Sequence, residues 1–197
     1  MSLSNIIALY KIFYDKTFYY FYNYNTQNNY NVIRYNKDNE STLTKFYTLI
    51  DNPYLIIDNI YLGSAQNSAN YNQLKNNNIG LIINVTDEIS NYYPNEFEYY
   101  NIKILDINSS SLFNSFESVL NTIEIFNKNN HGKNILVHCY MGCSRSASIL
   151  LIYIIVKHKM NYDEALKYLE NKKKNVNINI TFINEIKDYI KNKNIKD

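Results

Sequence analysis

Residues 134–157 read Asn-Ile-Leu-Val-His-Cys-Tyr-Met-Gly-Cys-Ser-Arg-Ser-Ala-Ser-Ile-Leu-Leu-Ile-Tyr-Ile-Ile-Val-Lys, and this stretch decides the fold. Its first part, Asn134–His138, is a short aliphatic run typical of a strand that is buried on both faces. Ser146–Lys157 is apolar on nearly every side, which is typical of a buried helix. The loop between them therefore connects the carboxyl end of a central strand to the amino end of a helix.

This loop predicts an anion-binding cradle. Backbone N–H groups at a helix amino terminus have no partners within the helix, and the helix dipole adds partial positive charge there. Gly142 has no Cβ, so the loop can curl tightly around a bound group. We expect the backbone of the loop to bind a phosphate.

Three side chains of the loop predict reactive chemistry. The planar fork of Arg145 can bind two phosphate oxygens at once. Cys139 opens the loop, where the positive field that binds phosphate also favours the thiolate, which is the nucleophilic form. Ser146 can donate a hydrogen bond to that sulfur and help it to leave later. The alternatives are a buried structural thiol at Cys139 and a surface ion pair at Arg145.

The segments around this loop alternate between strand and helix patterns, which predicts an α/β fold with a central, mostly parallel sheet flanked by helices. The predicted strands are Tyr54–Ile57, Asn59–Leu62, Leu81–Val85, Tyr99–Leu105 and Asn134–His138. The predicted helices are Ala65–Asn78, Ser115–Lys128, Ser146–Lys157, Asn161–Lys174 and Thr181–Lys193.

Attack by a sulfur on a phosphate ester releases an oxygen that needs a proton, so an acid must approach from another loop. Asp106 follows the strand Tyr99–Leu105, at the edge where loops of a parallel sheet gather. The same carboxylate can later take a proton from water. A loop-capping role is the alternative for Asp106, and Asp87 and Glu88 are rival acids at the same edge.

The composition excludes several classes of protein. A net charge of +2 over 197 residues lacks the large excess of positive charge that is typical of a dedicated nucleic-acid binder. Two cysteines cannot form a disulfide-rich scaffold, and they favour a reducing compartment. No apolar run reaches the roughly 18 residues of a membrane span, and the first residues lack the apolar core of a secretory signal. We expect a protein of the cytoplasm, or of the cytoplasm and the nucleus.

The chain divides near residue 51. Residues 1–50 form a Tyr/Asn-rich extension with nine of the 21 tyrosines, whereas residues 51–197 carry equal numbers of acidic and basic side chains. Apolar residues at helical spacing in 3–14 predict an amphipathic helix in the extension. Because this helix lacks a dense Lys/Arg stripe, packing on its own domain is favoured over binding a membrane or a partner.

Two further interpretations concern the cysteines. His138, Cys139 and Cys143 resemble part of a zinc site, but neither His131 nor His158 gives a standard ligand spacing. No metal and no cofactor is therefore expected. Cys143 is either a packing residue or a resolving thiol that forms a reversible disulfide with Cys139.

A group of lysines near the carboxyl ends of two predicted helices has two interpretations. Lys157, Lys159 and Lys172–Lys174 could form a basic patch that attracts acidic, phosphorylated substrates. Alternatively, they are solvated charges at helix ends, where lysine is favourable.

Several motifs together resemble the dual-specificity phosphatases of the protein tyrosine phosphatase superfamily. The central one is Cys-x5-Arg, here His-Cys-x2-Gly-x2-Arg-Ser at 138–146. Others follow in the family's order over residues 53–192, namely Ile60–Ser64, Gly80–Val85, Tyr99–Asp106, Ser144–Ser148, Asp163–Ala165 and Asn179–Phe182. The resemblance implies that 51–197 is a phosphatase catalytic domain.

The resemblance also implies a role for each matching residue. Cys139 is the nucleophile, Arg145 binds the phosphate, Asp106 is the general acid and Ser146 assists the thiolate, with His138 as a supporting residue next to the nucleophile. The implied phosphate-binding residues are Tyr140, Met141, Gly142, Cys143, Ser144 and Arg145.

The implied activity is hydrolysis of phosphotyrosine and phosphoserine/threonine on proteins through a cysteinyl-phosphate, without a metal, in signalling. The partner is then a phosphorylated protein, with no nucleic acid and no membrane span. The uncharged side chains at Tyr140, Met141 and Cys143 disfavour phosphoinositides, because phosphatases of that class usually carry lysine there. A phosphoprotein-binding module with little catalysis and a phosphatase of RNA 5′ ends or lipids are the competing hypotheses.

Overall fold

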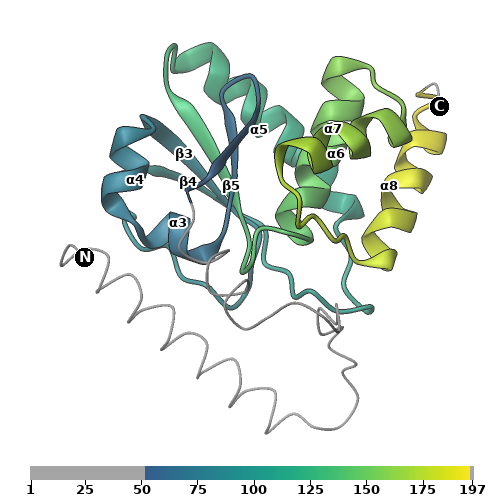
Figure 1. Ribbon diagram of the computed structural model, residues 1–197, viewed down its shortest axis with the longest axis horizontal. Helices are drawn as coiled ribbons and strands as arrows, with labels where there is room; N and C mark the ends of the chain where they lie inside the picture. The colour runs from purple at the N-terminus through teal and green to yellow at the C-terminus, as the bar shows by residue number, and fades with distance from the viewer. Residues whose placement is uncertain (1–51, 196–197) are drawn as a thin grey trace, which may run out of the picture.

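Five strands form one sheet in the computed structural model, which describes residues 52–195 (Figure 1). Their spatial order is β1-β2-β5-β3-β4. Only β1 and β2 pair antiparallel, and the other neighbours are parallel, which confirms the predicted α/β class with a mostly parallel sheet. The strands are β1 (Tyr54–Ile57), β2 (Ile60–Gly63), β3 (Ile79–Asn84), β4 (Glu98–Asn101) and β5 (Asn134–His138).

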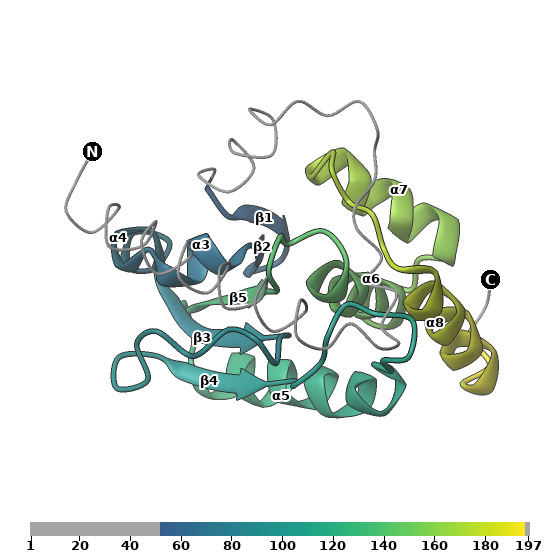
Figure 2. The ribbon, with the colours of Figure 1, turned by 90° about the horizontal axis from the view of Figure 1, so that it is seen from below.

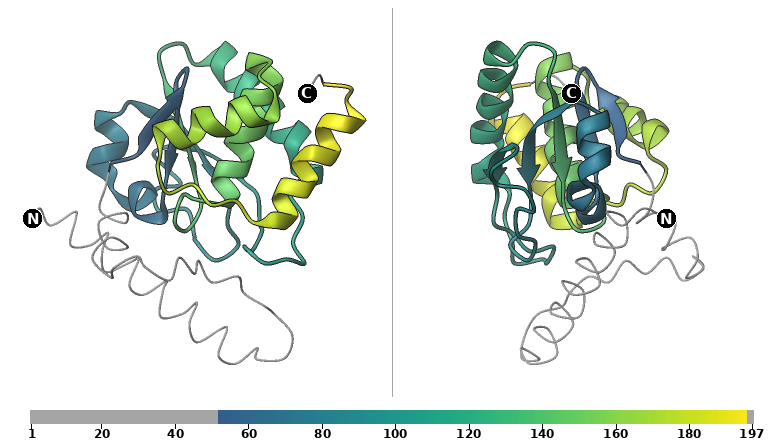
Figure 3. Two further views of the ribbon diagram at one scale, coloured as in Figure 1. Left: turned by 45° about the vertical axis from the view of Figure 1, so that its right-hand side comes forward. Right: turned by 90° about the vertical axis from the view of Figure 1, so that its left-hand side faces the viewer.

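Helices cover both faces of this sheet (Figures 2 and 3). One face carries the short helices α3 (Ala65–Ala69) and α4 (Tyr71–Asn76). The other face carries the larger layer, formed by a 3₁₀ turn η1 (Phe113–Ser115), α5 (Phe116–Asn129), α6 (Arg145–His158), α7 (Tyr162–Lys172) and α8 (Ile180–Asn192).

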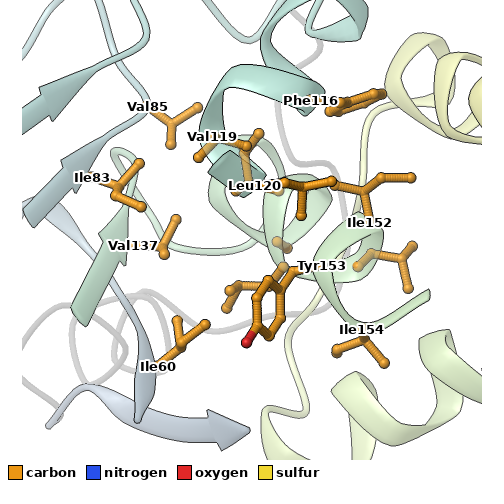
Figure 4. Close-up of a cluster of buried hydrophobic side chains, with 14 of the residues drawn as sticks. Ile60, Ile83, Val85, Phe116, Val119, Leu120, Val137, Ile152, Tyr153 and Ile154 are labelled. Carbon is orange, nitrogen blue, oxygen red and sulfur yellow. The ribbon is translucent and has the colours of Figure 1, made fainter. Parts of the chain in front are cut away.

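Alternation along the central strands divides the core into two apolar layers. Ile83 and Val137 point to the main layer, together with residues of α5 and α6 (Figure 4). Ile82 and Leu136 point to the other face, where Leu74 of α4 covers them. Because both faces are buried, β3 and β5 read as aliphatic runs rather than as alternating patterns.

The central helix α6 is as deeply buried as its sequence predicts. Every residue of Arg145–Ile155 is buried, and the helix packs between the sheet and its neighbours α5, α7 and α8. Its amino end, at the carboxyl end of β5, is therefore fixed by the core and provides a rigid base for the loop between them.

The predicted helix Ala65–Asn78 is wrong as one unit, because Asn70 divides it into α3 and α4. Asn70 has non-helical backbone angles and caps the second helix by accepting a hydrogen bond from the Gln73 N–H at 3.2 Å. An asparagine side chain competes well for such N–H groups, so it favours a helix start over a helix interior. The following strand also begins earlier than predicted, at Ile79.

The predicted strand Tyr99–Leu105 is also too long. The ladder between β3 and β4 ends at the Asn84–Asn101 pair, and the Ile102 N–H makes the last bond, to the Asn84 carbonyl. The carbonyl of Ile104 accepts instead from the Asp87 N–H and from Arg145. Residues beyond Asn101 therefore leave the ladder and contact the loops at the carboxyl edge of the sheet.

Two further predictions concern the amino-terminal extension and the absence of a membrane-spanning segment. The Tyr/Asn-rich extension 1–50, with its predicted helix, lies outside the described residues. In the part of the chain that the structure describes, none of the helices combines the length and apolar character needed to cross a membrane.

The packing predicts a large difference between two residues of α5. Phe116 is fully buried, and its ring meets that of Tyr189 edge to face at a centroid distance of 5.5 Å. Phe116→Ala should lower the free energy of unfolding by about 3–5 kcal/mol, since it leaves a cavity. Ile125→Ala, on the same helix but at a side chain that is 62% exposed, should change it by less than about 0.5 kcal/mol. Urea denaturation measures both, and equal losses would contradict this packing.

Candidate active site

The loop that joins β5 to α6 encloses a cysteine sulfur. Cys139 is 1% exposed, and its Sγ accepts hydrogen bonds from the Gly142 N–H at 3.3 Å and from the Ser146 hydroxyl at 3.2 Å. The predicted contact between Ser146 and the sulfur is present in the structure.

The outward carbonyls of the loop indicate where its N–H groups point. The Tyr140 carbonyl accepts from the Ala65 N–H at 3.0 Å, and the Cys143 carbonyl accepts from the Asn177 N–H at 2.9 Å. In a trans peptide the C=O and the following N–H point in opposite directions. The N–H groups of Met141 and Ser144 are therefore directed away from these outer neighbours, toward the interior of the loop.

Gly142 allows the loop to take this shape. Its φ is +71°, in the region where side chains are strained, and a Cβ there would lie 2.5 Å from the carbonyl oxygen of Gly63. The loop thus packs directly against the backbone at the end of β2. Any other residue at this position would displace one of these backbones.

A buried ion pair orients Arg145. Nη1 donates to Glu88 Oε2 at 2.8 Å and Nη2 lies 2.7 Å from Oε1, while Nη1 also donates to the Ile104 carbonyl at 2.9 Å. Burial lowers the pKa of the guanidinium, but the charges of Glu88 and Cys139 raise it by more, so the net pKa is above its usual value. Arg145 is therefore a permanent cation with a fixed plane.

This arrangement leaves one side of the guanidinium available. Arginine has five N–H groups, and Glu88 and Ile104 engage three of them. The Nε–H is buried and has no hydrogen-bond partner among the described residues. Together with the remaining Nη2 hydrogen, it forms a parallel pair of donors of the kind that binds two oxygens of a phosphate.

Glu88 is held by a polar network at the end of β3. Asn84 Nδ2 donates to the Ile89 carbonyl at 2.8 Å, and the Thr86 hydroxyl donates to Asn84 Oδ1 at 2.6 Å. The Ile89 N–H returns a bond to Thr86 Oγ1 at 3.2 Å. These bonds fix both sides of Glu88, which the sequence suggested only as a rival acid; here its carboxylate is engaged by Arg145.

Asp106 lies at the edge of the same loop. Its Oδ1 accepts from the Ser144 hydroxyl at 3.0 Å and from Asn179 Nδ2 at 3.3 Å, and its Oδ2 is 3.8 Å from Arg145 Nε. The side chain is 28% exposed, so it can reach a bound substrate. The structure thus places Asp106, rather than Glu88, with a carboxyl oxygen free to face the cradle.

His138 and Cys143, two other titratable residues of this segment, are neutral. Burial lowers the pKa of His138 to about 4, so its imidazole is uncharged near neutral pH, next to the Cys139 carbonyl. Burial raises the pKa of the Cys143 thiol to about 12, which keeps it in the weakly nucleophilic thiol form. This supports the packing role of Cys143 over that of a resolving thiol.

Two alternative sites from the sequence are not assembled. Within residues 52–195, no three side chains of His, Cys, Asp or Glu gather as metal ligands would, and His158 contacts Asp58 instead. The lysines do not share one exposed patch. Lys157 pairs with Glu124, and Lys173 is 3% exposed with its amine over the Tyr54 ring.

Three groups meet at this loop. They are a buried sulfur that accepts a hydrogen bond from a loop N–H, an arginine with a free pair of donors, and a neighbouring carboxyl. On a mostly parallel sheet with a buried helix behind the loop, they define a phosphate-binding domain of the protein tyrosine phosphatase superfamily. The family model for "Dual specificity phosphatase, catalytic domain" matches residues 60–192. The chain belongs to the dual-specificity phosphatase family.

Curated relatives support this assignment over most of the described residues. The protein phosphatase Slingshot of Drosophila melanogaster is 32% identical over 140 residues, and human Slingshot homolog 2 is 34% identical over 140 residues. Each match covers 71% of this chain but only 13% and 10% of the relatives. A probable rhodanese domain-containing dual specificity protein phosphatase of Dictyostelium discoideum is 33% identical over 68% of this chain and 28% of its own length.

Solved structures show the same fold. The human tyrosine phosphatase-like serine/threonine/tyrosine-interacting protein aligns with a TM-score of 0.67 and 22% identity, covering 72% of this chain and 97% of that one. Human DUSP28 aligns with a TM-score of 0.68 and 18% identity, covering 73% and 96%. At these identities the likeness concerns the fold.

The structure brings the predicted residues together, while their catalytic roles stay predictions. Cys139, Arg145, Ser146 and Asp106 converge on one loop, as the Cys-x5-Arg spacing and the end of a strand indicated. The pairing of Glu88 with Arg145 and the contacts of the Ser144 and Asn179 side chains were not predicted from the sequence. The polar Asn84, at the end of an aliphatic run, was the one available signal for the network that holds Glu88.

The buried His138 predicts a loss of stability in acid. Its pKa is lower in the folded chain, at about 4, than in the unfolded chain, at about 6.5, so the unfolded chain binds a proton first as the pH falls. The stability contributed by neutral His138 is complete above pH 6.5 and is lost as the pH falls toward 4. The expected loss over this window is roughly 3 kcal/mol.

Urea denaturation of wild type and His138→Gln at several pH values tests this linkage. The difference in free energy of unfolding between the two proteins should shrink as the pH falls from 6.5 to 4, because only wild type carries the titrating group. A difference that stays constant over this window would contradict the prediction.

Proposed function

We propose that this chain is a protein phosphatase that hydrolyses phosphate monoesters of tyrosine, serine and threonine side chains through Cys139. The observation that carries the proposal is the convergence of three groups. The buried sulfur of Cys139, the two free donors of Arg145 and the Oδ2 of Asp106 all face the same loop. A phosphate held by the loop would lie between nucleophile and acid.

In the first step the Cys139 sulfur forms a bond to phosphorus while the bond to the ester oxygen breaks. The proton of Asp106 passes to that departing oxygen, which would otherwise leave as a high-energy anion. The products are a cysteinyl-phosphate and a neutral alcohol or phenol. Arg145 and the loop N–H groups stabilise the charge on the transferring phosphoryl group.

In the second step water attacks the cysteinyl-phosphate. Asp106, now a carboxylate, accepts a proton from this water as the oxygen bonds to phosphorus. The bond between phosphorus and sulfur breaks, and the thiolate is stabilised by the Ser146 hydroxyl and the Gly142 N–H. Inorganic phosphate is released and both Cys139 and Asp106 return to their starting protonation states.

The surroundings of the cradle support a protein substrate. Tyr140, Met141 and Cys143 offer no positive charge for the extra phosphates of an inositol head group. We also propose that the enzyme acts in signalling in a reducing compartment, the cytoplasm alone or with the nucleus. Both Cys139 and Cys143 are free thiols, in keeping with that compartment.

Turnover by two active-site variants tests the proposal. Wild-type protein should release phosphate from a phosphotyrosine peptide under reducing conditions, and Cys139→Ser should abolish turnover because a hydroxyl is a far weaker nucleophile here. Asp106→Ala should slow the peptide reaction by about 10²–10⁴-fold, the usual contribution of a general acid. The surface variant Ile125→Ala is the control and should retain wild-type rates.

The competing hypotheses give different results in the same assay. Binding of phosphopeptides without turnover would indicate a phosphoprotein-binding module and contradict the proposal. Faster release from RNA 5′ phosphates or phosphoinositides than from phosphopeptides would contradict the proposed substrate class.

The two-residue mechanism also predicts the dependence of kcat/KM on pH. The reaction requires Cys139 as the thiolate and Asp106 as the protonated acid, so kcat/KM should first rise and then fall as the pH increases. In Asp106→Asn the falling limb should disappear, since amide side chains do not titrate. A flat wild-type profile between pH 5 and 8 would contradict this pairing.

A further inference from the structure

The Ser144 side chain links the phosphate loop to the general-acid loop. Ser144 is 4% exposed and sits immediately before Arg145, and its hydroxyl donates to Asp106 Oδ1 at 3.0 Å. The Ser144 hydroxyl oxygen also accepts a hydrogen bond from the main-chain N–H of Asn179 at 3.1 Å. Neither of these two bonds involves the Cys139 sulfur, so they point to a separate task.

The direction of these hydrogen bonds is fixed by chemistry. A main-chain N–H can only donate, so Ser144 Oγ must accept from Asn179 and has its single proton left for Asp106. The Asn179 amide is also oriented, because its oxygen accepts from the Thr181 N–H at 2.9 Å. Its NH₂ group must then face Asp106 Oδ1, at 3.3 Å.

Both donors therefore meet the same carboxyl oxygen. A proton on Asp106 Oδ1 would point at two other donors, whereas Oδ2 accepts no hydrogen bond from the described residues. Oδ2 is also the oxygen that faces the cradle, 3.8 Å from Arg145 Nε.

We propose that Ser144 and Asn179 are positioning residues that keep the catalytic proton on Oδ2 of Asp106 and aim it at the leaving group. This rests on the proposed function, since it assigns how the general acid of that reaction is oriented. The two residues act through Asp106 and need not touch the substrate.

Helix α8 extends the same arrangement along the acid loop. The Thr181 hydroxyl donates to the Asn108 carbonyl at 3.3 Å, and Glu185 Oε2 accepts from the Leu112 N–H at 2.8 Å. Because α8 is anchored in the core through Phe182 and Ile186, the loop after Asp106 is held to a rigid element. The position of the acid is thereby set by α8 as well as by the phosphate loop.

The dependence of the rate on the leaving group tests this proposal. p-Nitrophenyl phosphate releases a stable phenolate that needs little protonation, whereas phenyl phosphate releases a basic one that depends on the general acid. Ser144→Ala and Asn179→Ser each remove one donor to Oδ1, and serine keeps a cap for α8. Each variant should lower kcat on phenyl phosphate about 10-fold or more beyond its effect on p-nitrophenyl phosphate.

The ratio of the two kcat values does not depend on how much of a variant is folded, so poor folding does not imitate the effect. Ser148→Ala is the matched control. It removes a buried hydroxyl that donates to the Ser144 carbonyl at 2.9 Å without contacting Asp106, and it should leave the ratio unchanged. In an Asp106→Asn background, Ser144→Ala should also leave the ratio unchanged, because the acid is already lost.

Equal losses on both substrates in Ser144→Ala and Asn179→Ser would overturn the positioning role while leaving the proposed function intact. A wild-type protein that turns over neither substrate would overturn the proposed function, and this inference with it.

Discussion

The contact on which the site depends most is the buried ion pair between Arg145 and Glu88. Removing both charges from water costs several kcal/mol per ion, so the pair persists only with close geometry and additional hydrogen bonds. The structure provides both, with distances of 2.8 and 2.7 Å and a further bond to the Ile104 carbonyl. The pair joins the start of α6, the loop after β3 and the segment after β4, so these three parts are fixed relative to one another.

The consequence for chemistry is that Arg145 is both anchored and available. Glu88 binds the end of the guanidinium, and the Nε–H on its side has no hydrogen-bond partner among the described residues. Asp106 is held by Ser144 and Asn179, and the Cys139 sulfur is held by the N–H of Gly142. The parallel sheet brings these loops to one edge, because the carboxyl ends of β5 and β3 lie side by side and β4 follows β3.

Sequence alone predicted the parts of this site that depend on local pattern. The aliphatic run Asn134–His138 and the apolar helix after Ser146 predicted the strand, the loop and the helix, and the spacing from Cys139 to Arg145 predicted that these two side chains lie at the same loop. Local sequence patterns did not predict the contacts between segments that are distant in the chain. Glu88 and Asp106 are both acids after strands, and only the folded arrangement shows that Glu88 forms the close, hydrogen-bonded pair with the arginine while Asp106 lies farther away. The division of the predicted helix at Asn70 was likewise not predicted. An asparagine within a helical pattern acts as a helix cap only when the neighbouring residues form a turn there.

Trapping the covalent intermediate tests whether the Cys139 sulfur attacks phosphorus. Protein mixed with a radiolabelled phosphotyrosine peptide is quenched by denaturation within a turnover and digested, and the labelled fragment is identified by mass spectrometry. Phosphate is expected on the sulfur of Cys139 in wild type, and no label is expected in Cys139→Ser. Turnover without a labelled protein, or label on another side chain, would contradict it.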